Sequence, residues 1–174
     1  MRLLLRRLLF ALVAVAFVVP VSAGEPLREP GESVILTVSG NIGVTNAPGV
    51  AKFDRAMLDT MPQTTVVSYT DWTEGPQTFQ GVLLGDLIAR VEGRGVEIVV
   101  TALNDYGAII PWSDLDDHAV LLALMQNGAP MSVRDKGPIW IIYPDSEPKS
   151  EPGGDFARLH NGKMVWQLNR IEVR

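Results

Sequence analysis

Polar and aromatic side chains gather between two apolar runs of the sequence. Five of them fall within six positions: Tyr69, Thr70, Asp71, Trp72 and Glu74. The β-branched pair at 66–67 predicts a strand before them, and the Gly-Pro pair at 75–76 predicts a turn after them. Aromatic rings, a hydroxyl and carboxylates on a loop held by a rigid frame are typical of a ligand site. A solvated turn whose tryptophan folds into the core explains the same residues equally well.

Two later loops carry side chains of similar kinds. The first offers an amide, a carboxylate and a phenol, and the second offers two cations: Asn104, Asp105, Tyr106, Arg134 and Lys136. Each of the three loops lies at the end of a predicted strand, where a sheet can bring separate loops to one rim. Ordinary turn formers and solvated hairpin charges are the alternative interpretation.

Together these loops suit a flat, nitrogen-rich heterocycle. Its face can stack on the ring of Trp72 or Tyr106. A carboxylate can accept two parallel N–H groups from a 2-aminopyrimidinone edge, in the geometry that pairs carboxylate with guanidinium. A cation from Arg134 or Lys136 would neutralise a phosphate or face a ligand carbonyl. The sequence therefore predicts a small-molecule site at the rim of a sheet.

Other kinds of chemistry have little support. The chain has no cysteine, which removes thiolate nucleophiles, redox centres and metal ligands. Its two histidines, His118 and His160, are far apart in sequence, which argues against a histidine-rich metal site. The acids at 114–117 suit either a hard cation or the positive end of a helix dipole. No phosphate-binding loop, dinucleotide fingerprint or nucleophile elbow is present, and we expect no metal.

The first residues have the pattern of a secretory signal peptide. Three arginines within the first seven residues precede an apolar run at 8–19, and small residues at 21–23 mark a cleavage site. We therefore expect a signal peptide at 1–23, a periplasmic protein, and no membrane insertion after the signal is removed. An uncleaved membrane anchor is the alternative, although the apolar run is short for a bilayer span.

Without the signal peptide the chain is acidic. Residues 24–174 hold twelve basic and twenty acidic residues, a net charge of −8. This charge disfavours nucleic acid and anionic membranes as partners. The length suits one domain, stabilised by burial rather than by disulfides. We expect a flexible leader at 24–33, because it is rich in proline and glutamate, and a single domain at 34–174.

Short strands outnumber helices in the pattern of apolar residues. Strands are expected at 34–40, 63–69, 96–102, 108–111, 119–125, 131–133, 139–143 and 164–173, and helices at 53–61, 82–91 and 113–116. Asn127-Gly128 is the strongest hairpin signal. Because strands and helices do not alternate regularly, the predicted fold class is α+β, with mixed or antiparallel sheets and a few short helices.

Several segments occur in an order that resembles a known domain. They are LTVSG at 36–40, FQGVLLGDL at 79–87, Asn104-Asp105-Tyr106, the run 121–128, and Lys136-Gly137-Pro138 followed by Tyr143-Pro144. In this order they resemble the molybdopterin-binding domain of the sulfite oxidase family, and in particular its small, exported, single-domain members. The resemblance covers residues 34–145 and implies the fold of that domain.

The chain departs from the catalytic members of that family at the metal ligand. Those enzymes bind molybdenum through a cysteine thiolate in the stretch before the F-x-G-V segment. Here that stretch is 68–72, and it holds no cysteine. A hydroxyl or carboxylate is a poor substitute for a soft sulfur ligand. The resemblance therefore does not carry oxo-transfer activity to this chain, and we expect no catalysis.

The resemblance still implies a pterin pocket. The chain is similar to exported proteins that bind a reduced pterin, or a molybdopterin-like ligand, and report it to a membrane-bound sensor such as a cyclase or kinase. In such proteins the pterin stacks on an aromatic residue before the F-x-G-V segment, here Trp72. Asp71, Glu74 or Asp105 would hold the amino edge of the ligand. The alternatives are a molybdenum oxidoreductase with non-cysteine ligation, and an interaction protein that kept only the fold.

Overall fold

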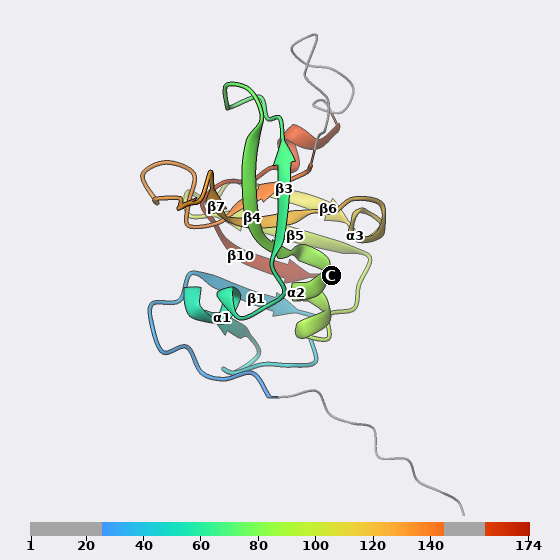
Figure 1. The fold of residues 1–174 in the computed structure, drawn as a ribbon. Coiled ribbons are helices and arrows are strands. Elements are labelled where there is room, and N and C mark those ends of the chain that lie inside the picture. The colour runs from blue at the N-terminus through green and yellow to red at the C-terminus, as the bar shows by residue number, and fades with distance from the viewer. Residues whose placement is uncertain (1–25, 145–158) are drawn as a thin grey trace, which may run out of the picture.

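Two five-stranded sheets carry the fold (Figure 1). The structure is a computed structural model that describes residues 26–144 and 159–174, so the expected signal peptide lies outside the described residues. The first sheet contains, in spatial order, β2 (Ala51–Phe53), β1 (Leu36–Gly40), β10 (Leu168–Val173), β5 (Glu97–Ala102) and β6 (Gly107–Pro111). The second contains β3 (Thr64–Ser68), β4 (Gln77–Leu83), β7 (Leu121–Gln126) and β8 (Ala129–Pro130), with β9 (Trp140–Ile142) paired to β7.

The helices are short. They are α1 (Arg55–Asp59), α2 (Leu84–Arg90), α3 (Asp114–Asp117) and the 3₁₀ helix η1 (Asn161–Lys163). None in the described part of the chain is long and apolar enough to cross a membrane. β1 and β10 run parallel, whereas the other pairs of described strands are antiparallel. This combination confirms the α+β prediction.

Both sheets contribute to one apolar core. In β5 the residues Ile98, Val100 and Ala102 are buried, while the residues between them are partly exposed. This alternation is what the pleat of a strand with one buried face produces. β7 is buried at four successive positions, 121–124, because it lies between β4 and β9. The core therefore holds the sheets rigid beneath the loops at their rims.

The F-x-G-V segment is a strand, and the prediction of a helix from Val82 is wrong. β4 continues to Leu83, and α2 begins only at Leu84. Ladders to β3 and β7 hold the segment extended. Gly81 packs so closely on β7 that a Cβ there would lie 2.0 Å from the carbonyl oxygen of Leu122. A short apolar run has the same residue pattern whether it forms a helix or a strand. Pairing with β3 and β7 is therefore what makes this segment a strand.

The predicted hairpin turn is present, but its return strand is shorter than expected. Asn127 and Gly128 have φ angles of 52° and 79°, as a tight hairpin turn requires. The return strand is β8, at 129–130, and the prediction of a strand at 131–133 is wrong. Pro130 has no N–H group with which to extend the ladder, so the pairing stops there.

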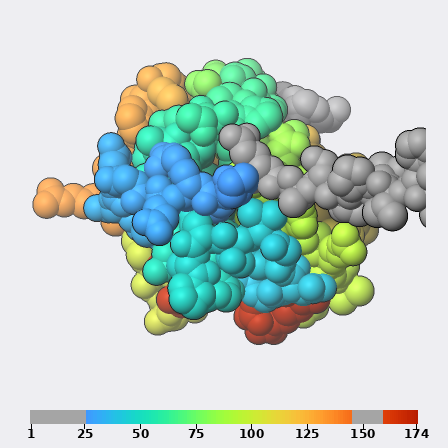
Figure 2. All heavy atoms as spheres, turned by 90° about the horizontal axis from the view of Figure 1, so that it is seen from below, coloured from blue at the N-terminus to red at the C-terminus, as the bar shows by residue number. Residues whose placement is uncertain are grey.

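Asp54 connects the N-terminal segment, shown in blue in Figure 2, to α1. The carboxylate of Asp54 accepts hydrogen bonds from the Met57 N–H at 2.7 Å, from Arg28 at 3.0 Å and from the Gly31 N–H at 2.7 Å. Burial raises the pKa of this carboxyl, but these bonds and one from Glu32 outweigh it and lower the pKa to about 2. The carboxylate therefore stabilises the fold above its unfolded pKa of about 3.9, and this contribution is lost as the pH falls through the lowered value.

β3 and β4 form a hairpin that stands out from the body, with residues 69–76 at its tip (Figure 1). Five register pairs hold the two strands together, from Thr64–Gly81 to Ser68–Gln77. The tip reaches η1, which comes from the far end of the chain, because Asn161 bonds to Asp71. The hairpin thus carries the polar-aromatic stretch to a place where three distant segments meet.

Candidate functional site

A hollow of about 280 Å³ lies where the hairpin tip, the β5–β6 turn and the segment around η1 come together. Its lining residues are Trp72, Ala102, Asn104, Tyr106, Asn161, Met164, Val165 and Trp166. Three of them, Trp72, Asn104 and Tyr106, are residues that the sequence singled out. The volume is near the lower end of the range for small-molecule sites, about 300–1,000 Å³, as suits a single bicyclic ring.

Two tryptophans form a corner of this hollow. The ring centroids of Trp72 and Trp166 are 5.3 Å apart, and the ring planes meet at 86°. Trp140 is fully buried behind them, with its centroid 6.1 Å from that of Trp72. Edge-to-face contacts of this kind fix the orientation of each ring. Trp72 therefore packs on the core with one part of its ring and lines the hollow with another.

Side-chain amides, rather than carboxylates, supply the polar groups of the hollow. Asn161 donates from Nδ2 to the carboxylate of Asp71, so its carbonyl oxygen is the end available to a ligand N–H. Asn104 accepts the backbone N–H of Tyr106 at 3.1 Å through Oδ1, so its NH₂ group is the end available to a ligand carbonyl. One acceptor and one donor match the alternating N–H and C=O groups of a pyrimidinone edge.

Two more of the predicted residues shape the walls. Tyr106 is 51% exposed, and its hydroxyl donates to the carbonyl of Gly162 at 3.0 Å, which ties the β5–β6 turn to η1. Thr70 is buried, and its hydroxyl shares a hydrogen bond of 2.8 Å with that of Thr73 and accepts the Trp72 N–H at 3.2 Å. Thr70 therefore orders the loop that carries the tryptophan.

The remaining predicted residues do not line the hollow: Tyr69, Glu74, Asp105, Arg134 and Lys136. Asp105 is exposed and forms an ion pair with Arg170. Lys136 pairs with Asp135 at 3.2 Å and lies 5.4 Å from the ring centroid of the buried Trp140. None of the described lining residues is charged, so the predicted cation does not reach this site.

Half of the lining comes from a segment that the sequence analysis did not single out. These residues lie in η1 and in the chain that directly follows it: Asn161, Met164, Val165 and Trp166. The sequence predicted a strand at 164–173, whereas β10 begins at Leu168. The sequence signal that could have indicated a site here is Trp166 close to the turn-forming pair Asn161-Gly162. The hairpin tip likewise combines a tryptophan with a turn-forming pair.

A buried polar cluster adjoins the same segment. Asp114 accepts hydrogen bonds from the Tyr143 hydroxyl and from Lys163 Nζ, both at 2.6 Å. Burial raises the pKa of the Asp114 carboxyl, but these two partners outweigh it and hold the pKa below its usual range. Burial, and then the nearby carboxylate, raises the pKa of the Tyr143 phenol, so the phenol remains a donor. His118 and His160 meet with their Nε2 atoms 3.3 Å apart, although they are distant in sequence.

Comparison with known proteins identifies the family and supports the fold. Residues 52–147, more than half of the chain, match the oxidoreductase molybdopterin binding domain. The chain belongs to this family. The sulfane dehydrogenase SoxCD from Paracoccus pantotrophus has a similar structure, with a TM-score of 0.56 and 18% sequence identity. The likeness covers 79% of this chain and 37% of that chain, and at this identity it shows the fold alone. No curated protein sequence matches the chain.

The family implies a molybdopterin-type ligand, and the residues present fit the pterin part of it. Trp72 and Trp166 offer ring faces, and Asn104 and Asn161 offer a donor and an acceptor. The donor set does not fit the molybdenum ligation of the catalytic members that the chain resembles, because the whole chain lacks the cysteine thiolate that this ligation requires. In addition, no three His, Asp or Glu side chains within 26–144 and 159–174 are grouped so that they could hold a metal.

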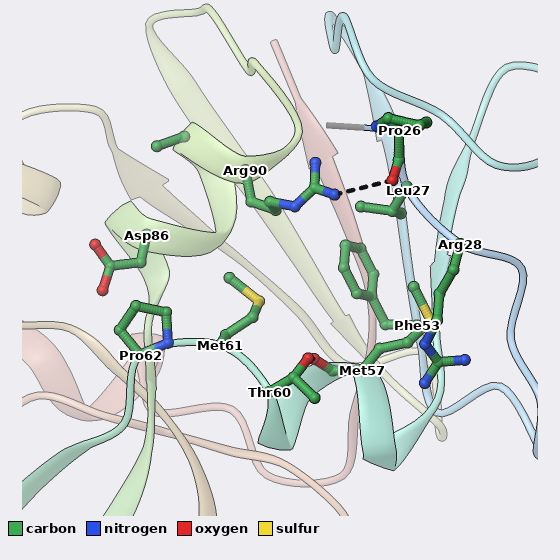
Figure 3. Close-up of a pocket in the computed structure, with 11 residues that line it drawn as sticks. Pro26, Leu27, Arg28, Phe53, Met57, Thr60, Met61, Pro62, Asp86 and Arg90 are labelled. Atoms are coloured by element: carbon green, nitrogen blue, oxygen red, sulfur yellow. Dashed lines mark hydrogen bonds between the residues drawn. The ribbon is translucent and has the colours of Figure 1, made fainter. Parts of the chain in front are cut away.

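A second hollow, of about 590 Å³, is less suited to the family's ligand (Figure 3). Its floor is apolar, with Phe53, Met57 and Met61 directed into the space. The two arginines at its edge are engaged, Arg28 with Asp54 and Arg90 with the Pro26 carbonyl oxygen at 3.4 Å. None of the polar-aromatic residues that the sequence singled out lines it. We therefore place the candidate site of this molybdopterin-binding domain in the smaller hollow.

Proposed function

We propose that the protein is an exported module that binds a reduced pterin, performs no oxo transfer, and reports its ligand state to a membrane-bound signalling protein such as a cyclase or kinase. The observation that carries this proposal is the combination of tryptophan faces and amide groups around one hollow, in a chain without any thiol. A ring-shaped ligand with an aminopyrimidinone edge uses both features at once.

The lining of the hollow favours a pterin ring. A ligand stacked on Trp72 would meet the perpendicular ring of Trp166 at its edge, an arrangement that aromatic groups prefer. Asn104 and Asn161 lie beside it as donor and acceptor. Asp71 acts indirectly, because it orients the Asn161 amide. A neutral pterin needs no counter-charge, which is consistent with the uncharged lining.

Two further features support a binding role over catalysis. The chemistry that molybdenum supplies in this family needs a soft thiolate ligand, and the chain has none. The buried side chains with perturbed pKa values near the site, Asp114 and Tyr143, are engaged with each other and with Lys163. The pattern of a signal peptide supports a periplasmic location.

The test is a titration of the purified protein with a tetrahydropterin under anaerobic conditions, followed by tryptophan fluorescence. Three of the four tryptophans, Trp72, Trp140 and Trp166, are in contact around the hollow. We therefore expect saturable quenching at one ligand per chain. The variant Trp112→Phe removes the tryptophan outside this cluster, so we expect it to keep the quenching of the cluster as an equal or larger fraction of its total fluorescence.

The absence of saturable quenching, with the fold intact, would overturn the proposal. The protein would then be an interaction domain that has kept the fold of its family but not the pterin site. Quenching that disappears in Trp112→Phe would also count against it, because the ligand would then lie outside the hollow.

A further inference from the structure

Adjacent residues of the β5–β6 turn line the candidate hollow and a separate recess of about 350 Å³. Three aliphatic residues around this recess form what we call the apolar patch: Val34, Leu103 and Val133. They are 44%, 49% and 52% exposed, and they come from the N-terminal segment, the residue after β5 and the loop after β8. Single apolar residues are common on protein surfaces, but three distant segments that gather theirs around one recess indicate a contact surface.

The loop that carries Val133 also carries an unpaired cation. Arg134 follows Val133 directly and is exposed. Its neighbours Asp135 and Lys136 pair with each other at 3.2 Å, and no described residue forms an ion pair with Arg134. An unpaired arginine beside an apolar patch favours a partner that brings a carboxylate to it.

A second copy of the chain is a poor occupant for this surface. In a two-fold contact between identical patches, the same residues from both copies come together. The acids beside the patch are already engaged, Asp105 with Arg170 and Asp135 with Lys136. The two Arg134 side chains would therefore approach each other without a counter-charge. The surface instead fits a different protein with an apolar anchor and an acidic residue beside it.

Gln167 connects the patch to the candidate hollow. It follows Trp166, which lines the hollow, and its carbonyl oxygen accepts the Leu103 N–H at 3.0 Å. Its Nε2 atom donates to the Val133 carbonyl oxygen at 2.8 Å, and its backbone N–H donates to the Lys136 carbonyl oxygen at 3.0 Å. Its φ angle of 53° lies in the left-handed region, which a residue other than glycine keeps only where its surroundings hold it. A ligand that orders Trp166 is therefore expected to order both loops of the patch.

We propose that the apolar patch and Arg134 form the docking surface for a partner protein, which inserts an aliphatic or aromatic side chain that has an aspartate or glutamate beside it. The apolar anchor fills the recess between Leu103 and Val133, and the carboxylate pairs with Arg134. Gln167 couples this contact to the hollow, so the ligand-loaded protein binds the partner more tightly than the empty one. That the partner is the membrane-bound signalling protein rests on the proposed function, whereas the docking surface does not.

Site-specific photo-crosslinking in the native host tests this surface in the exported protein. We expect the photoreactive amino acid benzoylphenylalanine, in place of Leu103, to form a cross-link with a partner protein. Mass spectrometry of the product should show a cross-linked partner peptide with an apolar residue beside Asp or Glu. Val96 is the matched control position, because it is 78% exposed and directly precedes β5, whereas Leu103 directly follows it. The same amino acid in place of Val96 should not form this product.

Charge reversal distinguishes the proposed ion pair from unspecific apolar contact. With the probe at position 103, Arg134→Glu should lower the yield of the product by about tenfold, because an attraction becomes a repulsion. Arg94→Glu is the control, because Arg94 is also exposed and the change in net charge is the same. This variant should leave the yield unchanged. Exchanging the acidic residue of the partner peptide for lysine should restore the product with Arg134→Glu.

The coupling through Gln167 has a readout of its own. The identified partner peptide, made synthetically, should bind about fivefold more tightly to protein saturated with tetrahydropterin than to empty protein. Gln167→Asn shortens the side chain that bonds to the Val133 carbonyl, and asparagine tolerates the left-handed region. The variant should therefore fold and show a smaller effect of the ligand. Equal affinity of the wild type with and without the ligand would overturn the coupling.

Four results would overturn the docking surface. They are no product at position 103, equal loss of product in Arg134→Glu and Arg94→Glu, a cross-linked peptide without an acidic residue beside an apolar one, and a product that joins two copies of this chain. The proposed function fails separately. A specific cross-link from a protein that binds no tetrahydropterin, or to a partner outside the membrane, supports the docking surface and contradicts the proposed function. Pterin binding without the cross-link supports the pterin site and contradicts the docking surface.

Discussion

Replacing Lys163 with methionine is expected to lower the free energy of unfolding by about 3 kcal/mol, because it leaves the Asp114 carboxylate buried without its cation. The side chains of Lys163 and Asp114 are only 18% and 10% exposed, and their charged atoms are 2.6 Å apart. Tyr143 still donates one hydrogen bond to the carboxylate, but a neutral phenol does not replace a positive charge. Urea unfolding at neutral pH measures the difference.

The pH dependence provides an internal control for this prediction. The carboxyl of Asp114 has a lowered pKa in the fold, so its contribution to stability is present above the unfolded pKa and is lost as the pH falls through the folded one. The unfolded state is common to both proteins, so the gap in stability between wild type and Lys163→Met should narrow as the pH falls through the Asp114 pKa of the variant toward the lowered pKa of the wild type. The double variant Asp114→Asn, Lys163→Met removes both charges and should recover part of the loss. A gap below about 0.5 kcal/mol at neutral pH would show that the pair adds no more than a surface ion pair.

Replacing Trp72 with alanine is expected to weaken pterin binding by about 1–3 kcal/mol, or roughly fivefold to more than hundredfold, by analogy with stacking of nucleic-acid bases on aromatic side chains. Trp72 presents its ring to the hollow between Trp166 and the buried Trp140. Trp72→Phe keeps a ring face and should retain most of the affinity. Because the native residue is half-buried, the alanine variant should also lose some stability, which a melting curve separates from binding.

A second core residue distinguishes stacking from packing at this position. Phe79 is fully buried and meets Trp140 edge to face with 5.4 Å between centroids, but it does not line the hollow. Phe79→Leu should lower stability while leaving pterin affinity unchanged in the folded protein. If Trp72→Ala behaves in the same way, Trp72 is a core residue and the site assignment is wrong.

Local patterns predicted the parts of this fold that depend on neighbours in sequence. Patterns of consecutive residues predict the alternation in β5, the hairpin turn at 127–128 and the polar loop at 69–76. Each of these features lies where it was expected. The boundary between β4 and α2 was misplaced, because the apolar run at 82–84 has no period of its own and is held by β7. β2 is only three residues long, too short for any pattern to show.

The site was only half predictable, for a related reason. Trp72, Asn104 and Tyr106 sit in turns whose composition marks them, and they meet at the hollow. Asn161 and Trp166 join them only because the chain returns to the hairpin tip after a separation of ninety residues between Asp71 and Asn161. The meeting of the two histidines depends on the same return. Neither the contact between Asp71 and Asn161 nor that between the two histidines can be predicted from patterns of neighbouring residues.

We propose that this molybdopterin-binding domain holds a pterin without molybdenum. The most direct test is to export and purify the protein natively, denature it, and determine the mass and fluorescence of what is released together with the molybdenum content. We expect a released pterin and far less than one molybdenum atom per chain. Molybdenum close to one atom per chain would contradict this proposal and support a molybdenum oxidoreductase with a metal ligand other than cysteine.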